Sequence, residues 1–260
     1  KLSDCESKRI LIDKGSWQKD FSIIVTPTII IFVNGEEEKR YQANIMMTME
    51  ATQIELQGKI DEIMMDSFFK KIYSHPNIKN DNYKTIIEAH ERVEFFKNDT
   101  ILNEGKVSNA YYLIKKGLFR SYVIDYKGNE ITTDFFGPND ILIEVASLFL
   151  RIPSKETIQA ITDCEVYKID FNDFQNLYGT IDGFTEWGRA WMSHQLFMAK
   201  HRAVNMHTQS ASQRYLNLTQ EKPLIIKEVP LKHIATYLGI TDTSLSRIRK
   251  EVLFKVDNLP

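Results

Sequence analysis

Five short polar or charged side chains near the C-terminal end can make hydrogen bonds to the edges of nucleic-acid bases or to phosphates. They recur at a spacing that places them together on the outer face of a predicted helix, and they are Asp242, Thr243, Ser246, Arg247 and Lys250. Hydroxyl groups donate to and accept from base edges, and a guanidinium or an ammonium group pairs with phosphate. The chemistry of this face therefore indicates a nucleic-acid ligand.

The charge of the same segment agrees with a polyanionic partner. The whole chain of 260 residues has a formal net charge of −2, which favours no partner. Residues 231–255, however, contain five lysine and arginine residues against two acidic ones. A basic end on a slightly acidic body is typical of a protein that docks one end on DNA.

Two short predicted helices position this face. Pro230 favours a helix start, and Gly239 breaks the first helix where a left-handed backbone conformation is needed. Thr241 is predicted to cap the second helix. The buried faces are predicted from apolar spacing and comprise Leu231, Ile234, Ala235, Leu238, Leu245, Ile248 and Val252. The pattern predicts a helix-turn-helix; the alternative is an ordinary helical hairpin with a solvated face.

A long helix is predicted upstream, starting from a cap at Thr180 or Asp182 and ending near residue 206. It carries two apolar stripes, of which the first is Phe184, Trp187, Trp191, His194, Met198, His201 and Asn205. The second stripe is Met192, Leu196, Ala199 and Ala203. A helix with two apolar faces must bury both, which favours dimerisation on a two-fold axis, with Trp187, Trp191 and Met198 as interface residues. The alternative is that both stripes pack within one subunit.

The middle of the chain is predicted to be a β-sandwich or barrel, because short strands alternate with turn residues at close spacing. A helix over residues 66–73 precedes it, and a short helix over residues 172–177 closes it. The predicted strands cover residues 91–96, 100–102, 110–116, 117–124, 130–136, 141–145, 156–160 and 164–169.

Residues 1–64 have a different character. A β-branched run ends in Asn34-Gly35, which predicts a strand and a hairpin turn, with a return strand from Lys39 and an amphipathic helix over residues 48–63. Val25-Thr26-Pro27-Thr28 before an apolar strand resembles the second half of a thioredoxin-like domain, whose proline is usually cis. The CxxC of that family is missing. Residues 65–69 are typical of the start of a separate protein, which leaves open a fusion at this point.

Several motifs together resemble the Crp/Fnr family of transcription regulators, in the branch common in Bacteroidetes. The resemblance spans residues 65–252 and implies a cyclic-nucleotide-binding-type β-roll (a jelly-roll-like double-stranded β-helix), a dimerising helix and a winged-helix-like DNA-binding end. The motifs are Ile234-Ala235-Thr236-Tyr237-Leu238-Gly239-Ile240-Thr241, Ser244-Leu245-Ser246-Arg247-Ile248-Arg249-Lys250, Gln213-Arg214-Tyr215-Leu216, Tyr111-Tyr112-Leu113-Ile114-Lys115-Lys116-Gly117, Ile158-Gln159-Ala160 and Cys164-Glu165-Val166.

The fold class is thus α+β, in four parts. They are a partial thioredoxin-like segment (1–64), a β-roll sensor (65–179), a dimerisation helix (180–207) and a helix-turn-helix domain (208–260).

The resemblance also implies roles for single residues. The positions that contact bases in the family fall on Thr243, Ser246 and Arg247, and Arg247 suits bidentate pairing with guanine. The Fnr-like branch has a glutamate at the position of Thr243, so its target sequence does not transfer. Phosphate contacts are expected from Thr241, at a helix N-terminus, and from Arg249 and Lys250.

The predicted effector pocket departs from the cyclic-AMP-binding members, which use Gly-Glu-Leu for the ribose and an arginine for the cyclic phosphate. Here Ile143-Glu144-Val145 keeps only the glutamate, and the segment Ser154-Lys155-Glu156-Thr157 contains no arginine. Lys155 offers a point charge without the bidentate fork, and Glu156 repels phosphate. Glu144, Ser154, Lys155 and Thr157 are therefore the candidate pocket, with an unidentified effector, and tight cyclic-AMP binding is not expected.

Other classes of function are disfavoured by composition. Two cysteines, Cys5 and Cys164, exclude a disulfide framework and a cysteine-rich zinc or iron–sulfur site. No metal or cofactor is expected, and His194 and His201 are predicted as packed or surface residues rather than ligands. No catalytic triad or phosphate loop appears, so an enzyme is not expected. With no apolar run long enough to cross a bilayer, a cytoplasmic location is expected.

The function predicted from the sequence is that of a homodimeric transcription regulator that binds palindromic duplex DNA and works with RNA polymerase. One alternative is a nucleotide- or small-ligand-binding regulatory module without a DNA role. A second alternative is a thioredoxin-like redox protein, which the absence of a cysteine pair opposes. Target sequence, effector, and activation or repression are left open.

Overall fold

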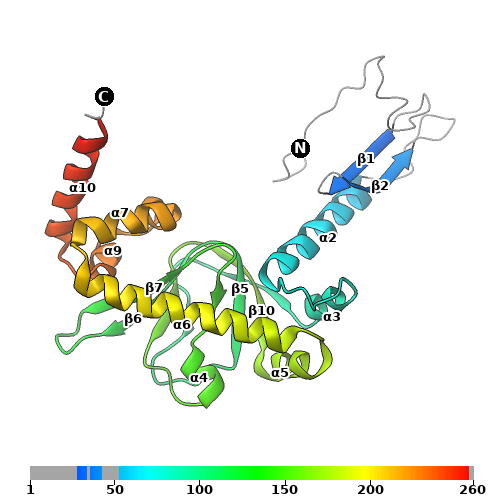
Figure 1. The fold of residues 1–260 in the computed structure, drawn as a ribbon, viewed down its shortest axis with the longest axis horizontal. Helices are drawn as coiled ribbons and strands as arrows, with labels where there is room; N and C mark the ends of the chain where they lie inside the picture. The colour runs from blue at the N-terminus through cyan, green and yellow to red at the C-terminus, as the bar shows by residue number, and fades with distance from the viewer. Residues whose placement is uncertain (1–27, 34–35, 43–52, 258–260) are drawn as a thin grey trace. The chain divides into compact units, whose positions relative to one another are not determined.

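The computed structural model describes residues 28–33, 36–42 and 53–257 (Figure 1). The chain divides into two compact units, Lys1–Ser67 and Phe68–Pro260. Each unit is described by itself. The three predictions that concern Cys5, Pro27 and the Asn34-Gly35 turn lie outside the described residues.

The first unit contains an antiparallel pair of strands, β1 (Thr28–Val33) and β2 (Glu36–Gln42). The register pairs Val33 with Glu36, and a bulge lies between Ile31 and Phe32. The predicted strand pair is confirmed, with the return strand beginning three residues earlier than expected. The likeness to a thioredoxin-like domain stays a prediction.

Helix α2 (Gln53–Ile72) continues from the first unit into the second. The sequence analysis had predicted two helices here, over residues 48–63 and 66–73. The break between the two helices is wrong, because no proline or glycine interrupts the chain between Lys59 and Ile72 and nothing stops helix propagation there. The two compact units divide between Ser67 and Phe68, three residues after the domain boundary predicted between residues 64 and 65.

Two four-stranded antiparallel sheets build a β-roll in the second unit. Their strand orders are β3-β10-β5-β8 and β4-β9-β6-β7. The strands are β3 (Glu91–Phe95), β4 (Thr100–Leu102), β5 (Ala110–Lys116), β6 (Phe119–Ile124), β7 (Glu130–Phe136), β8 (Ile141–Leu142), β9 (Thr157–Ala160) and β10 (Cys164–Asp170). The antiparallel roll predicted from the sequence is confirmed.

Both sheets contribute side chains to one core, because alternate residues of each strand point inward. The buried members of this core are Leu102, Ile114, Phe119, Leu142, Ile158, Ala160, Cys164 and Val166. Gly117 connects β5 to β6 with a φ of +95°, so the strand predicted to begin there starts two residues later. A Cβ atom at Gly117 would lie 2.4 Å from Cys164 Sγ and 2.7 Å from the Asp163 carbonyl oxygen.

Replacement of Gly117 should therefore destabilise the roll strongly. Gly117→Ala combines a left-handed backbone with overlap against a backbone carbonyl, and we expect a loss of about 2–5 kcal/mol in the free energy of unfolding. Gly128→Ala is the matched control, since Gly128 has a φ of +84° with no atom within 4 Å of its Cβ position. Urea denaturation of both variants checks this; equal losses would contradict the steric argument.

Three short helices cover the roll: α3 (Asn82–Glu88), α4 (Val145–Leu150) and α5 (Phe171–Thr180). Helix α4 corrects the strand predicted over residues 141–145, which ends at Leu142. The Glu144 side chain caps α4 by accepting a hydrogen bond from the backbone N–H of Ser147. A capped helix start overrides the apolar alternation that had suggested a strand.

The C-terminal part of the second unit is helical. Helix α6 (Phe184–Thr208) begins at Gly183 without a side-chain cap, so neither Thr180 nor Asp182 caps it. The helices that follow are α7 (Ala211–Glu221), α8 (Pro223–Glu228), α9 (Leu231–Tyr237) and α10 (Asp242–Asp257). They share an apolar core with Leu118, Phe135 and Ile161 of the roll, and α9 lies against β7 (Figure 1).

Candidate functional site

A tight turn separates α9 from α10. Gly239 has a φ of +67°, and the N–H of Ile240 donates to the Ala235 carbonyl at 3.0 Å, which ends α9. Thr241 then caps α10, because its hydroxyl oxygen accepts from the N–H of Ser244 at 3.2 Å. The predicted helix break at Gly239 and the predicted cap at Thr241 are both confirmed.

The two faces of α10 differ as the sequence predicts. Leu245 and Ile248 are buried against Ala235 of α9, which is itself fully buried. The small Ala235 side chain lets the two helices approach closely. The opposite face of α10 is solvent-exposed and carries Asp242, Thr243, Ser246, Arg247 and Lys250.

Basic side chains on this outer face are free to meet a ligand. Within the described residues, Arg247, Arg249 and Lys250 take part in no ion pair. Arg247 and Lys250 are exposed, while Arg249 is half-buried at the edge of the face. Thr241 is exposed at the N-terminal end of α10, where unpaired backbone N–H groups attract anions. The residues predicted to contact bases and phosphates thus all lie on α10 or at the cap before its first turn.

A second candidate site is a pocket of about 240 Å³ in the β-roll. Of the four predicted pocket residues, only Glu144 lines it. The floor is apolar and includes Leu102, Leu142 and Ile158. Polar lining residues are Ser108, Asn109, Tyr112, Lys168 and Asp170.

The other predicted pocket residues are engaged elsewhere. Ser154 is buried, and its hydroxyl closes a turn by donating to the Glu156 carbonyl at 2.8 Å. Thr157 accepts from the N–H of Glu104 at 3.1 Å, and Lys155 is exposed. The expectation that these three residues converge with Glu144 around one pocket is therefore wrong.

The Glu156 carboxyl group, between Lys155 and Thr157, disfavours an anionic ligand. Burial raises the pKa of its carboxyl group, hydrogen bonds with Thr133 and Ser121 oppose that shift, and the nearby Glu144 carboxylate raises the pKa further. The segment Ser154–Thr157 thus offers an anionic ligand a lysine and a carboxyl group, but no guanidinium.

Sequence reasoning missed Tyr112 and Lys168. They lie directly opposite each other on β5 and β10. Both occupy inward-facing positions, two residues from the core members Ile114 and Val166. Lys168 Nζ pairs with Asp170 at 3.0 Å, and burial raises the pKa of the Tyr112 phenol. The sequence did contain a signal for this pair. On each predicted strand the alternation of side chains places a polar residue on the same face as the core residues.

Helix α6 offers an exposed apolar surface. The side chains that remain at least a third exposed are Met192, Leu196, Phe197, Met198, Val204 and Met206. The predicted second stripe, Met192, Leu196, Ala199 and Ala203, is exposed along its length. An uncovered apolar stripe on a long helix is typical of a protein–protein interface.

Trp187 is a correction to the predicted interface. It is only 5% exposed, its indole N–H donates to the Ile72 carbonyl at 2.9 Å, and its ring packs on Tyr73 at a centroid distance of 4.6 Å. This residue belongs to the core of its own subunit and is unavailable to a partner. Trp191 is half-buried and stacks on Trp187, and Met198 is 40% exposed.

Comparisons with known proteins bear on the second unit. Residues 92–180 match the cyclic nucleotide-binding domain family. The chain is 25% identical over 179 residues to the anaerobic regulatory protein of Aggregatibacter actinomycetemcomitans, a match that covers 65% of this chain and 68% of that protein.

Two solved structures share the fold. FixK2 from Bradyrhizobium japonicum superposes with a TM-score of 0.55 at 18% identity, over 64% of this chain and 85% of its own. A transcriptional regulator of the Crp/Fnr family from Eubacterium rectale gives a TM-score of 0.55 at 19% identity, over 72% and 89%. Among the described residues, no helix has the length and apolarity to cross a bilayer, and no cluster of His, Cys, Asp and Glu is placed to bind a metal ion.

Proposed function

We propose that this chain, which matches the cyclic nucleotide-binding domain family over residues 92–180 and shares its fold with a Crp/Fnr regulator, is itself a Crp/Fnr-type regulator and a homodimer that binds palindromic duplex DNA. The observation that carries this proposal is the outer face of α10, where exposed hydroxyl and cationic side chains lack partners within the described chain. In this proposal α9 and α10 are the two helices of a helix-turn-helix, and α10 enters the major groove.

The side chains of α10 divide into two roles. Thr243, Ser246 and Arg247 contact base edges, with the Arg247 guanidinium donating to guanine O6 and N7. Thr241, Arg249 and Lys250 contact phosphates, which fixes the position of the protein on the duplex. Base contacts select the sequence, and phosphate contacts supply affinity that depends on salt.

Helix α6 supplies the dimer contact in this proposal. Its exposed apolar stripe packs against the same stripe of a second copy, which places two α10 helices in successive major grooves, about 34 Å apart. Such a dimer in the cytoplasm would act on RNA polymerase at promoters. The related proteins are regulators rather than enzymes, which supports a role without catalysis.

Selection of genomic fragments by the purified full chain tests the proposal. We expect the recovered fragments to share an inverted repeat whose half-sites are one helical turn apart. The second candidate function is a ligand-binding regulatory module without a DNA role, which the β-roll pocket favours. Recovery of no enriched fragment, even at low salt, would leave that second function standing and refute the first.

Cyclic AMP should bind no more tightly than adenosine. The segment Ser154–Thr157, which the sequence aligns with the phosphate-binding motif, contains no arginine, so we expect the phosphate to gain no bidentate contact there. Calorimetry on the full chain with both ligands measures the difference. A submicromolar dissociation constant for cyclic AMP, together with much weaker adenosine binding, would contradict this expectation.

A further inference from the structure

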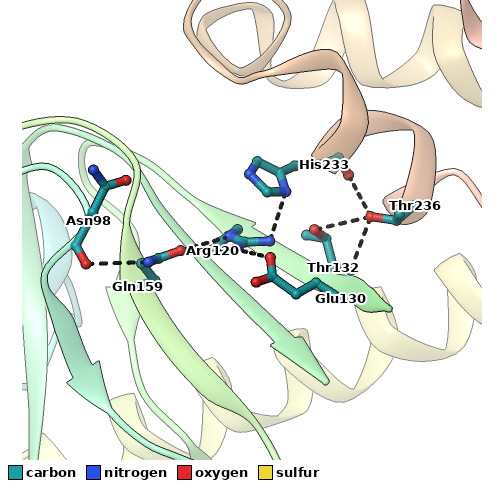
Figure 2. Close-up of polar contacts among 7 residues, drawn as sticks. All are labelled: Asn98, Arg120, Glu130, Thr132, Gln159, His233 and Thr236. Atoms are coloured by element: carbon teal, nitrogen blue, oxygen red, sulfur yellow. Dashed lines mark hydrogen bonds and ion pairs between the residues drawn. The ribbon is translucent and has the colours of Figure 1, made fainter. Parts of the chain in front are cut away.

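One buried arginine joins the β-roll to α9. Arg120, on β6, is 3% exposed, and its guanidinium uses all three nitrogens (Figure 2). Nη1 donates to His233 Nδ1 at 2.7 Å, and Nη2 donates to Glu130 at 2.5 Å and to Gln159 at 2.8 Å. Nε also donates to Gln159, at 3.3 Å. We call these four residues the Arg120 cluster.

A second polar contact lies beside the Arg120 cluster. The Thr132 N–H on β7 donates to the Thr236 hydroxyl oxygen at 3.2 Å, and the two hydroxyl groups lie 3.3 Å apart (Figure 2). Apolar contacts of Leu118, Phe135 and Ile161 also hold the helices on the roll, but apolar contact is non-directional. Hydrogen bonds depend on direction, so these polar contacts set the orientation of α9 and α10 relative to the β-roll.

We propose that Arg120 is a positioning residue for DNA binding: through His233 it fixes the orientation of the α9–α10 pair, and protonation of His233 releases that orientation. This inference rests on the proposed function of α10. Gln159 of the cluster lies on β9, two residues after Thr157, so the cluster also connects the strand that follows residues 154–157 to α9.

The direction of hydrogen bonding makes the contact sensitive to protonation. An arginine only donates, so His233 Nδ1 must be the acceptor and the imidazole must be neutral. A proton on Nδ1 would remove the acceptor and set two cations side by side. The charged groups that face His233 are Arg120 from β6, Lys232 from α9 and Glu130 from β7, and only Glu130 would favour the proton.

The sign of the pH effect follows from these surroundings. Burial, then the Arg120 guanidinium, lower the pKa of His233 from 6.5 to about 4 when α9 is docked. Released from the roll, the imidazole returns to its ordinary value, so the released state binds the proton first as the pH falls. By linkage, the docking equilibrium constant should drop about tenfold between pH 7.5 and pH 5.5.

Histidine titration by NMR tests the contact in the full chain without DNA. We expect His233, assigned with the His233→Asn variant, to titrate with a pKa well below that of an exposed histidine. Arg120→Gln should raise this pKa, and Arg120→Lys repeats the test if the glutamine variant does not fold. A His233 that titrates near 6.5 in the unaltered protein would overturn the inference.

The consequence for DNA is measured by fluorescence anisotropy on the selected duplex. A fixed orientation lowers the entropy lost when the two α10 helices are placed in their grooves, and protonation of His233 removes that advantage. The affinity for the duplex should therefore fall by up to about tenfold between pH 7.5 and pH 5.5. His233→Asn keeps an acceptor oxygen near the Nδ1 position but cannot be protonated in this range, so its affinity should vary little.

Arg120→Gln should weaken binding to the selected duplex and to an unrelated duplex by the same factor, because the base contacts on α10 are untouched. Tighter binding by Arg120→Gln, or a pH profile of His233→Asn that follows the unaltered protein, would overturn the inference. Failure of every variant to bind any duplex would refute the proposed function instead, and the NMR titration would still decide whether the Arg120 cluster acts as argued.

Discussion

Replacement of Arg247 by alanine should cost about 1–3 kcal/mol of binding free energy on the preferred duplex and remove discrimination at one base pair in each half-site. The side chain is exposed, has no ion-pair partner within the described residues, and follows Ser246 on the outer face of α10. Its loss removes a bidentate contact without disturbing Leu245 or Ile248, which hold α10 in place. Binding to a library of single-base variants of the site measures both effects.

Lys250→Ala is the matched control, because Lys250 lies on the same exposed face one turn further along. An ammonium group on phosphate carries no sequence information, so this variant should weaken all duplexes about equally. It should also lower the slope of log affinity against log salt by about one per subunit. Wild-type affinity of Arg247→Ala for the selected site would refute the base-contact assignment.

The pattern of local signals explains how much of the C-terminal helix pair could be predicted. Gly239, Thr241 and the apolar spacing through Leu245 and Ile248 act over one or two turns, and the structure follows each of them. The β-roll was predictable for the same reason. Its turns contain Asn98, Gly128 and Asn139, all with positive φ, at the predicted positions between strands. The resemblance to Crp/Fnr regulators, read from the same motifs, is confirmed by the comparisons.

Helix α4 shows where local signals compete. Ile141, Ile143 and Val145 alternate as a strand would. However, the Glu144 carboxylate caps a helix, and the fully buried Ser147 hydroxyl donates to the Ile152 carbonyl at 2.7 Å. The contact between Ser147 and Ile152 depends on how the following loop folds, and a short stretch of sequence does not determine that. Ser147 also accepts from the N–H of Ser108, 39 residues earlier.

The predicted pocket and the assignment of Trp187 to the interface failed for a different reason, because each depends on which face of an element packs against a residue distant in the sequence. Trp187 shares a helical stripe with Trp191, yet contact with Tyr73 buries only the first of them fully. Lys168 and Tyr112 meet only because β10 pairs with β5 across 56 residues. The Arg120–His233 contact spans 113 residues, and no motif marks it.

Glutamate substitutions on the exposed stripe of α6 should convert the protein to a monomer. Leu196 is 72% exposed in the single chain, and Ala203 lies two turns further along the same face. In a dimer, Leu196→Glu with Ala203→Glu would bring four carboxylates into an apolar seam, which is prohibitive unless they are neutralised or solvated. We expect sedimentation of the unaltered protein as a dimer at micromolar concentration and of the double variant as a monomer.

Disruption of the dimer contact on α6 must be distinguished from unfolding and from a general effect of added charge. Tyr126→Glu adds one negative charge per chain, against two in the double variant, at a side chain that is 91% exposed on the β6–β7 hairpin, so this control should remain a dimer. Both proteins should keep the helical circular dichroism of the unaltered chain, because neither change reaches the buried contacts of Trp187 with Tyr73.

A monomer presents only one α10 helix to the DNA, so the bivalent contact is lost. Affinity for the palindrome should then fall by about 10²–10⁴-fold, while a single half-site is bound as before. An unaltered protein that sediments as a monomer, or a double variant that stays dimeric, would show that α6 is not the seam and that half-site spacing is set elsewhere.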